Sequence, residues 1–258
     1  MSKLKSLKLQ RSYLRKLPSF KNTNVNNTET ENNISSAKTS QWFNPELELL
    51  DVSHNHYLYI LAPDGSDTLF PPSVKKLDFT GDSVPVLDDL IFSNLRSLQS
   101  LKLDMTRLNV VSRNSFTRND QLEEVSITGN TLREIPQLPA TVKVLNLMDN
   151  TIEKVTSLTG WASNEQTNYS YTTTVTKENI KNLLNLEVIN LSHGKISFIE
   201  SGVFKDMYKL SSLNISNNQL KEISDHTLEI RLVKELFFYL LKQSIVILDY
   251  KNLLTFLL

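Results

Sequence analysis

One spacing of apolar residues recurs along the whole chain and limits what it can fold into. It is clearest between Leu210 and Leu220, where the sequence reads L-x-x-L-x-L-x-x-N-x-L. Three further copies keep the asparagine and begin at residues 47, 122 and 142. Four looser copies keep the apolar frame and begin at residues 4, 74, 98 and 186. Such self-similarity, with a period of roughly 20 to 27 residues outside two longer intervals, predicts a stacked-repeat architecture.

The spacing also predicts where each residue lies. In the L-x-L segment two side chains share one face of a short strand, and the residue between them lies on the other face. A single unit cannot bury its apolar face alone, so neighbouring units must stack, and their strands form one parallel sheet. The asparagine ends the strand where the backbone bends inward, and its amide can pair with peptide groups that the sheet leaves free. We predict this structural role for Asn55, Asn130, Asn150 and Asn218.

In the looser copies other residues stand at the asparagine position. Ser12, Asp82 and Thr106 retain a hydrogen-bonding side chain there. Gly194 has none, so we expect a weaker bend in that repeat.

The template is the signature of the leucine-rich repeat. We therefore predict an α/β leucine-rich-repeat solenoid of horseshoe shape, with a parallel β-sheet on the concave face and mostly irregular or short helical segments on the convex side. Phe92, Phe116 and Phe204 each precede the first leucine of the next unit by six residues. This shared register predicts an aromatic spine inside the convex side.

The array is interrupted twice and decays at its end. We assign residues 1–240 to the repeats, with polar insertions near 19–42 and 157–180 that read as disordered or protruding segments. Residues 241–258 form a degenerate apolar tail. Charged residues interrupt this tail too often for a membrane span.

Composition excludes several classes of function. The 258 residues include 28 basic and 28 acidic ones, and their interspersed charges give no signature for nucleic acid. Cysteine is absent, which excludes disulfides and thiolate metal sites and is unlike the disulfide-tied end caps of extracellular repeat domains. The first repeat follows Met1-Ser-Lys directly, with no apolar leader. We therefore expect a fragment, a truncated gene model or a part of a larger assembly.

No catalytic constellation is present in the sequence. It contains neither a P-loop nor a G-x-G-x-x-G motif. His54 and His56 flank Asn55, and His193 is the counterpart of His54 in its own repeat, but two histidines on a bend without a third ligand make a poor metal site. We predict a protein that is not an enzyme and that needs no cofactor or metal.

The concave face is the best candidate for a binding surface. Its central outward residues form a column of mixed charge that lacks an anchoring aromatic side chain, with Tyr57 and Met105 as marginal anchors nearby. We predict that a ligand contacts Asp51, Asp78, Lys102, Ser126, Asn146, Asn190 and Asn214, the members of this column that follow Lys8.

N-x-S/T triplets occur at five asparagines and mark possible N-glycosylation sites: Asn26, Asn33, Asn168, Asn190 and Asn214. The first three lie in the polar insertions, where a glycan is harmless. The other two lie in the concave column, where a glycan would block part of any binding surface.

The roughly 24-residue units, the phenylalanine register and the segments Leu191-Ser-His193 and Asp51-Val-Ser-His-Asn55 resemble an ectodomain segment of a Toll-like receptor or a related animal receptor. The resemblance covers about 45–240. It implies an extracellular or cell-surface recognition module that binds a protein or other macromolecule and forms homo- or heterodimers in innate-immune or developmental signalling. The alternative is a cytosolic repeat scaffold for protein–protein interaction, which the absent cysteines and leader favour; such a chain would be cytoplasmic.

The assigned register is testable by two adjacent substitutions. Leu213→Ala removes a side chain from the predicted core and should cost roughly 2–5 kcal/mol in the free energy of unfolding. Asn214→Ala changes an outward residue and should be nearly neutral. Small and equal effects in urea denaturation would contradict the register.

Overall fold

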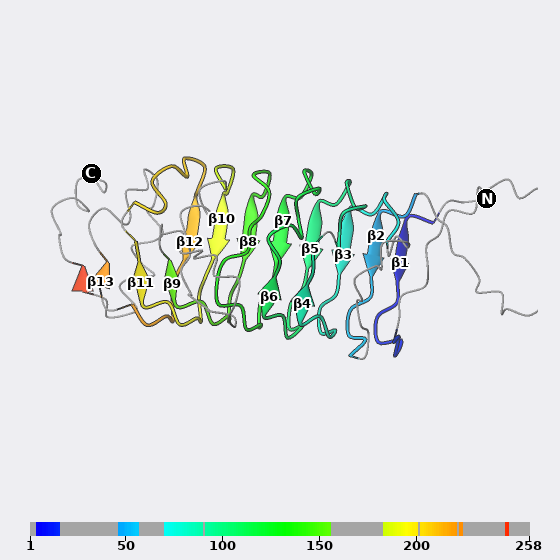
Figure 1. Ribbon diagram of the computed structural model, residues 1–258, viewed down its shortest axis with the longest axis horizontal. Helices are drawn as coiled ribbons and strands as arrows, with labels where there is room; N and C mark the ends of the chain where they lie inside the picture. Colours follow the sequence, from blue (N-terminus) through cyan, green and yellow to red (C-terminus); the bar gives the residue numbers. More distant parts are fainter. Residues whose placement is uncertain are drawn as a thin grey trace, which may run out of the picture.

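Eight three-residue strands form one parallel sheet along the length of the molecule. The computed structural model describes residues 4–15, 46–56, 70–89, 91–155, 183–200, 202–220, 222–223 and 246–247. The strands follow one another in the sheet in chain order (Figure 1). They are β1 (Ser6–Lys8), β2 (Leu49–Asp51), β3 (Lys76–Asp78), β5 (Ser100–Lys102), β7 (Glu124–Ser126), β8 (Val144–Asn146), β10 (Val188–Asn190) and β12 (Ser212–Asn214).

Each strand pairs with the next without a shift in register. Leu145 of β8 faces Ile189 of β10, which in turn faces Leu213 of β12, and all three side chains are buried. The same template position therefore forms a straight row from one repeat to the next. The last residue of every strand belongs to such a row, here named the inner column: Lys8, Asp51, Asp78, Lys102, Ser126, Asn146, Asn190 and Asn214.

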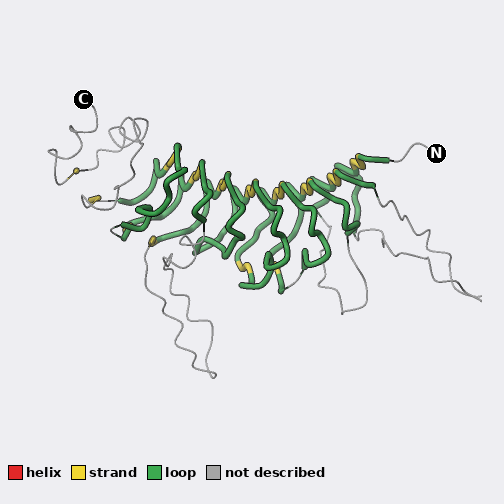
Figure 2. Tube along the Cα trace, turned by 90° about the horizontal axis from the view of Figure 1, so that it is seen from above, coloured by secondary structure: helices red, strands yellow, loops and turns green. Residues whose placement is uncertain are grey.

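The convex side consists of turns and short parallel strand pairs. β4 (Val86–Leu87) pairs with β6 (Val110–Val111), β9 (Lys154–Val155) with β11 (Phe198–Ile199), and β13 (Glu222–Ile223) with β14 (Val246–Ile247). No helix occurs in the described residues. The predicted solenoid is thus confirmed with irregular convex segments rather than helical ones, and its large sheet lines the inner side of a shallow arc (Figure 2).

An aromatic cluster fills the convex side of the core. The ring centroids of Phe92 and Phe116 lie 5.8 Å apart, as their shared register predicts. Phe70 extends this stack, with its centroid 5.9 Å from that of Phe92. It precedes Val74 by four residues instead of six, so the six-residue register did not predict it. Phe204 is also buried, but two repeats lie between it and Phe116, and its ring is not part of this stack. The predicted spine is therefore confirmed only in part.

A left-handed residue precedes the asparagine position in every one of the eight repeats. The φ angle there lies between 51° and 76°, a region that favours glycine, asparagine, aspartate and histidine. These residues are Arg11, His54, Gly81, Met105, Gly129, Asp149, His193 and Asn217. His54 and His193 thus occupy a backbone position that the bend requires, which explains why the two histidines recur at the same place.

Several predicted features lie outside the described residues. They include the two insertions near 19–42 and 157–180, most of the 241–258 tail, Tyr57, and the sequons at Asn26, Asn33 and Asn168. No helix in the described part of the chain is long and apolar enough to cross a bilayer.

Gly81 provides a test of how neighbouring bends fit together. A Cβ on Gly81 would lie 2.7 Å from Nδ1 of His54, whereas a Cβ on Gly202, also at positive φ, would meet nothing within 4 Å. Gly81→Ala should therefore destabilise the protein more than Gly202→Ala, which carries only the left-handed strain of about 1–2 kcal/mol. The additional His54→Ala substitution should remove the difference in thermal denaturation. Equal effects of the two single substitutions would show that the contact is unimportant.

Candidate functional site

Asn55, Asn130, Asn150 and Asn218 stand at the asparagine position of the template, here named the ladder position, and together form an asparagine ladder that holds the inward bends. Nδ2 of Asn55 donates to the backbone oxygens of Val52, at 2.5 Å, and of Leu9 in the preceding repeat, at 2.8 Å. Its Oδ1 accepts the N–H groups of Ser12 and Leu14, at 2.9 and 3.1 Å. One buried amide therefore satisfies backbone groups of two successive repeats.

The other three ladder asparagines repeat this geometry. Each donates from Nδ2 to the oxygen of the apolar residue that follows the strand of the preceding repeat, at 2.7–2.8 Å. Each also accepts, through Oδ1, an N–H group that lies two residues beyond the ladder position of that repeat, at 2.9–3.0 Å. These residues are Asn130, Asn150 and Asn218.

Two repeats without the asparagine complete the bend in different ways. Thr106 donates its hydroxyl to the backbone oxygen of Leu103 at 2.9 Å and so replaces part of an amide. At Gly194 the space of a side chain is occupied from the next repeat, because Oδ1 of Asn218 would lie 2.7 Å from a Cβ there. The small residue at Gly194 is therefore required by its neighbour.

Inner-column side chains are partly engaged by their own backbone. Five of them accept, through the Oδ1 atom, the N–H group of the residue two positions later, at 2.9–3.3 Å. These five are Asp51, Asp78, Asn146, Asn190 and Asn214. The bond closes the strand end, in the manner of an Asx turn, before the left-handed residue follows.

This capping role was missed in the sequence, although its signal is visible there. Asp51-Val-Ser53 and Asp78-Phe-Thr80 have the same form as the sequons Asn190-Leu-Ser192 and Asn214-Ile-Ser216. The bend therefore selects this triplet with aspartate as readily as with asparagine. The two inner-column sequons have a structural reason that is independent of glycosylation.

Two expectations change as a result. Asp51 is only 7% exposed and binds the N–H and hydroxyl groups of Ser53 together with the side-chain amide of Gln10, so it offers little to a ligand. Asn214→Ala removes the bond to the Ser216 N–H group and should cost about 0.5–1.5 kcal/mol. It is therefore not the neutral change that the sequence suggested.

The concave face divides into a charged and an uncharged part. From β1 to β7 it carries charges of both signs, including Lys8, Asp51, Lys76, Asp78, Lys102 and Glu124. Strands β8, β10 and β12, with the outward residues just after β8 and β12, present only uncharged side chains: Val144, Asn146, Met148, Val188, Asn190, Ser212, Asn214 and Ser216. We name this second set the uncharged half.

A row of amide donors crosses the uncharged half. Asn146, Asn190 and Asn214 are paired in register on adjacent strands and are partly exposed. Their Oδ1 atoms are taken by strand-end N–H groups, which fixes the orientation of each amide. Within the described part of the chain their Nδ2 groups donate to no protein atom. The row therefore offers oriented donors about 4.8 Å apart.

Oppositely charged side chains pair along the edge of the sheet, just before the strands begin. Glu48 lies 3.4 Å from both Lys5 and Lys75, and Glu123 lies 2.9 Å from Lys143. The hydrogen bond and charge of Lys5, with the charge of Lys75, lower the pKa of Glu48, while the hydrogen bond to Glu123 raises the pKa of Lys143. Because these pairs are exposed to solvent, each adds little to the free energy of unfolding.

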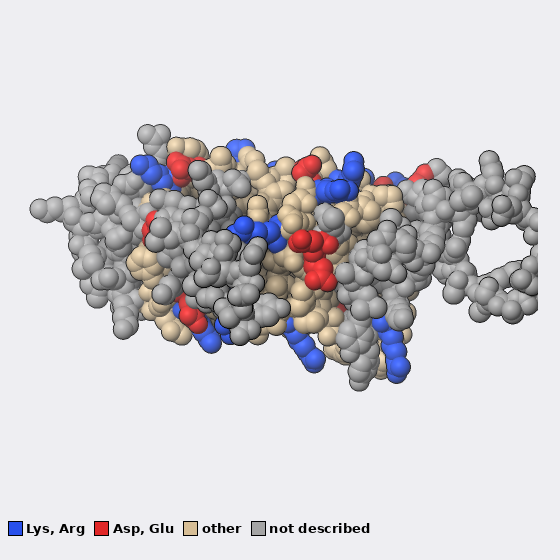
Figure 3. Space-filling model, in the orientation of Figure 1, with Lys and Arg blue, Asp and Glu red and all other residues tan. Residues whose placement is uncertain are grey.

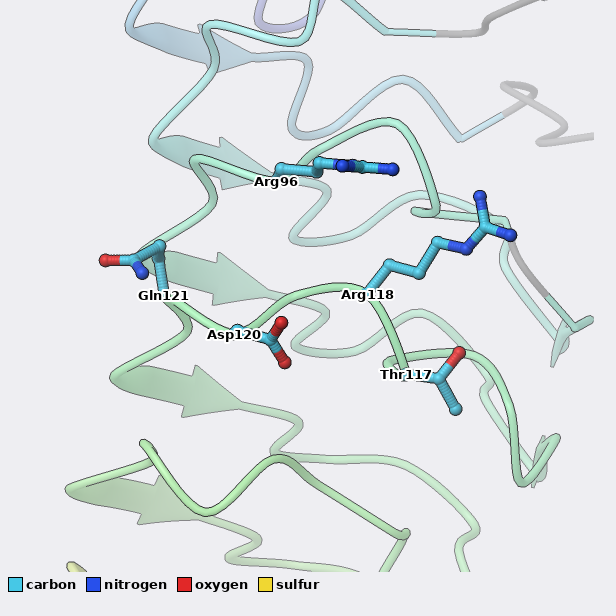
Figure 4. Close-up of a pocket in the computed structure, with 5 residues that line it drawn as sticks. All are labelled: Arg96, Thr117, Arg118, Asp120 and Gln121. Atoms are coloured by element: carbon cyan, nitrogen blue, oxygen red, sulfur yellow. The ribbon is translucent and has the colours of Figure 1, made fainter.

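A separate surface cavity of about 550 Å³ lies beside the loops that precede β5 and β7 (Figure 4). Arg96 and Arg118 extend on the same side of these loops, with Thr117, Asp120 and Gln121 completing the lining. All five residues are exposed. Charges of both signs are scattered over the face shown in Figure 3. Among the described residues no group of three or more histidine, aspartate or glutamate side chains could hold a metal ion.

Known protein families match two parts of the sequence. Residues 168–229 match the family described as Leucine rich repeat, and residues 71–140 match the BspA type Leucine rich repeat region with six copies. A solved leucine-rich-repeat protein of Leptospira interrogans superimposes with a TM-score of 0.57. The match covers 74% of this chain and 42% of that chain, at 18% sequence identity, and so shows a shared fold.

Two animal proteins are among the curated relatives. Lumican of Bos taurus is 29% identical over 164 residues, which cover 61% of this chain and 47% of lumican. Nephrocan of Mus musculus is 25% identical over 173 residues, which cover 67% of this chain and 29% of nephrocan. The chain thus spans less than half the length of these relatives. The repeat geometry and these matches together define it as a leucine-rich-repeat protein, similar to lumican and nephrocan.

The two kinds of asparagine can be separated by alanine substitution. Asn130→Ala leaves the Leu103 oxygen and the N–H groups of Thr106 and Leu108 without their partner and should cost about 3 kcal/mol or more. Asn146→Ala removes one strand-end bond at a partly exposed site and should cost about 0.5–1.5 kcal/mol. Urea denaturation measures both. A cost for Asn130→Ala no larger than that for Asn146→Ala would refute the ladder's structural role.

Proposed function

We propose that this protein is a non-enzymatic recognition module that binds a protein through the concave face of its solenoid. The observation that carries the proposal is the row of oriented amide donors on β8, β10 and β12. These donors need no rearrangement before binding, because the strand-end N–H groups already hold the amide oxygens. The similarity to lumican and nephrocan supports a role in protein interaction.

The chemistry of the uncharged half indicates the kind of ligand surface that it fits. Amide donors without free acceptors complement backbone carbonyl oxygens or other neutral acceptors. Val144 and Val188 lie beside the row and are partly exposed, so they add apolar contact area. A charged ligand surface finds no opposite charge among the side chains of the uncharged half itself. We therefore propose a largely neutral protein segment as the ligand of this half.

We propose an extracellular location for the protein. The support comes from the relatives, since lumican and nephrocan are extracellular proteins. We do not retain the cytosolic scaffold as an alternative, because the relatives give it no support. A part in a receptor for innate-immune or developmental signalling, of the Toll-like or a related class, is the finer form of the proposal. It is supported by the repeat length and by the phenylalanine register.

Binding through the concave face is tested by placing a large charged side chain in the donor row. The chain, secreted and immobilised, is used to isolate binding proteins from conditioned medium, and one identified ligand is then measured by calorimetry. Asn190→Arg should weaken that binding at least tenfold. Gln137→Arg, an exposed position outside the sheet, is the matched control and should not change it. Equal affinities of parent and Asn190→Arg would contradict the proposal.

Site-specific glycan occupancy tests both the location and the face. When the chain is expressed behind a signal peptide, we predict glycans at Asn26, Asn33 or Asn168 and unmodified side chains at Asn190 and Asn214. Mass spectrometry of peptides after glycosidase treatment in heavy-oxygen water reports each position. A full glycan at Asn190 or Asn214 would exclude binding through the uncharged half. No glycan at any of the five positions would weaken the extracellular assignment.

A further inference from the structure

Asp82 occupies the ladder position of the third repeat, where four other repeats have asparagine. The side chain is only 3% exposed. Its Oδ1 accepts the N–H group of Asn55 at 2.5 Å, as a ladder asparagine of the next repeat would do. Its Oδ2 is buried and has no hydrogen-bond partner. Oδ1 of Asp82 therefore has a hydrogen bond, and Oδ2 has none.

The missing bond can be identified from the other repeats. In all four ladder asparagines the second side-chain atom is an N–H donor to the apolar residue that follows the preceding strand, namely Leu9, Leu103, Ile127 or Leu191. The counterpart for Asp82 is the backbone oxygen of Val52. A carboxylate has no proton to donate, and two facing oxygens repel. A neutral carboxylic acid can donate its O–H group in the same direction.

The surroundings of Asp82 favour the neutral form. Burial is the main factor that raises the pKa of Asp82 to about 7, and the nearby charges of Asp78 and Asp51 raise it further against the lowering effect of the Asn55 N–H group. The other titratable groups beside this coil are His54, which lies against Gly81, and Asp104, whose backbone oxygen accepts the Gly81 N–H group. Among the residues that the structure describes, no lysine or arginine contributes an opposing charge.

We propose that Asp82 is held as a neutral carboxylic acid in the folded protein, where it completes the ladder as a donor, and that its ionisation makes the third repeat a pH-sensitive joint of the solenoid. The joint lies under β2 and β3, whose ends carry Asp51 and Asp78. Loss of the Asp82 proton therefore loosens the charged part of the concave face and leaves the uncharged half in place.

The direction of the pH dependence follows from the two states of the carboxyl group. The folded pKa is about 7 and the ordinary value is 3.8, so the folded protein binds more protons between these values. The stabilisation that Asp82 provides is present in full below about pH 4. It falls as the pH rises and is lost above about pH 7.

Substitution of Asp82 by asparagine tests the proposal, because asparagine has the donor at every pH. The melting temperature of the parent should fall between pH 5 and pH 8 relative to that of Asp82→Asn, which should be the more stable at pH 8. Both proteins contain the same histidines, so the effect of histidine titration on the melting temperature cancels in the difference between them. Asp104→Asn removes a charge from the same face outside the ladder and should leave the parent's pH slope unchanged. Parallel slopes for parent and Asp82→Asn would overturn the proposal.

The pKa of Asp82 can also be measured directly in the parent protein, which tests the proposal even if Asp82→Asn alters the fold. The carboxyl carbon of Asp82, observed by NMR in the parent protein, should titrate with a midpoint near pH 7. Amide hydrogen exchange of residues 70–89 should accelerate between pH 6 and pH 8 beyond its intrinsic pH dependence, while that of 186–200 should follow the intrinsic rate. A carboxyl midpoint below pH 5 would overturn the proposal regardless of the stability data.

Discussion

The inward bend after each strand is the constraint on which the rest of the structure depends. Parallel strands of three residues pair for a short distance only, and the chain then turns with a left-handed residue that leaves backbone groups inside the protein. Buried peptide groups without partners would cost more than so small a unit can recover. A ladder side chain that bonds two successive repeats removes this cost, and it also locks their register.

Much of this arrangement could be predicted from the sequence. The template predicted the eight strands of the large sheet, the buried row of Leu145, Ile189 and Leu213, and the membership of the inner column, because each depends on a local period of two residues. The convex side was less predictable, since Phe70 joins the aromatic stack from a different register. Such packing depends on the third dimension and leaves no fixed spacing in the chain.

The arrangement of the inner column was predicted from the sequence, but the hydrogen bonds of its side chains were not. The inner column looked like a row of free polar groups, whereas five of its members cap their own strand ends. The signal was present in the aspartate and asparagine triplets, but it was identical to that of a sequon. Only the direction of the Oδ1 atoms shows that these triplets cap the strand ends. The same direction leaves the Nδ2 groups of Asn146, Asn190 and Asn214 as oriented donors.

The central claim is that side chains, and not the sheet alone, hold the bends. The N–H groups of Leu108 and Leu132 lie outside the strands and are bonded to Oδ1 of Asn130 and Asn150, at 2.9 and 3.0 Å. Residue-resolved amide hydrogen exchange by NMR tests the claim most directly. Both amides should be protected as strongly as those of Leu101 and Val125 within the sheet. Exchange of Leu108 and Leu132 at the rates of an open loop, with the sheet still protected, would contradict it.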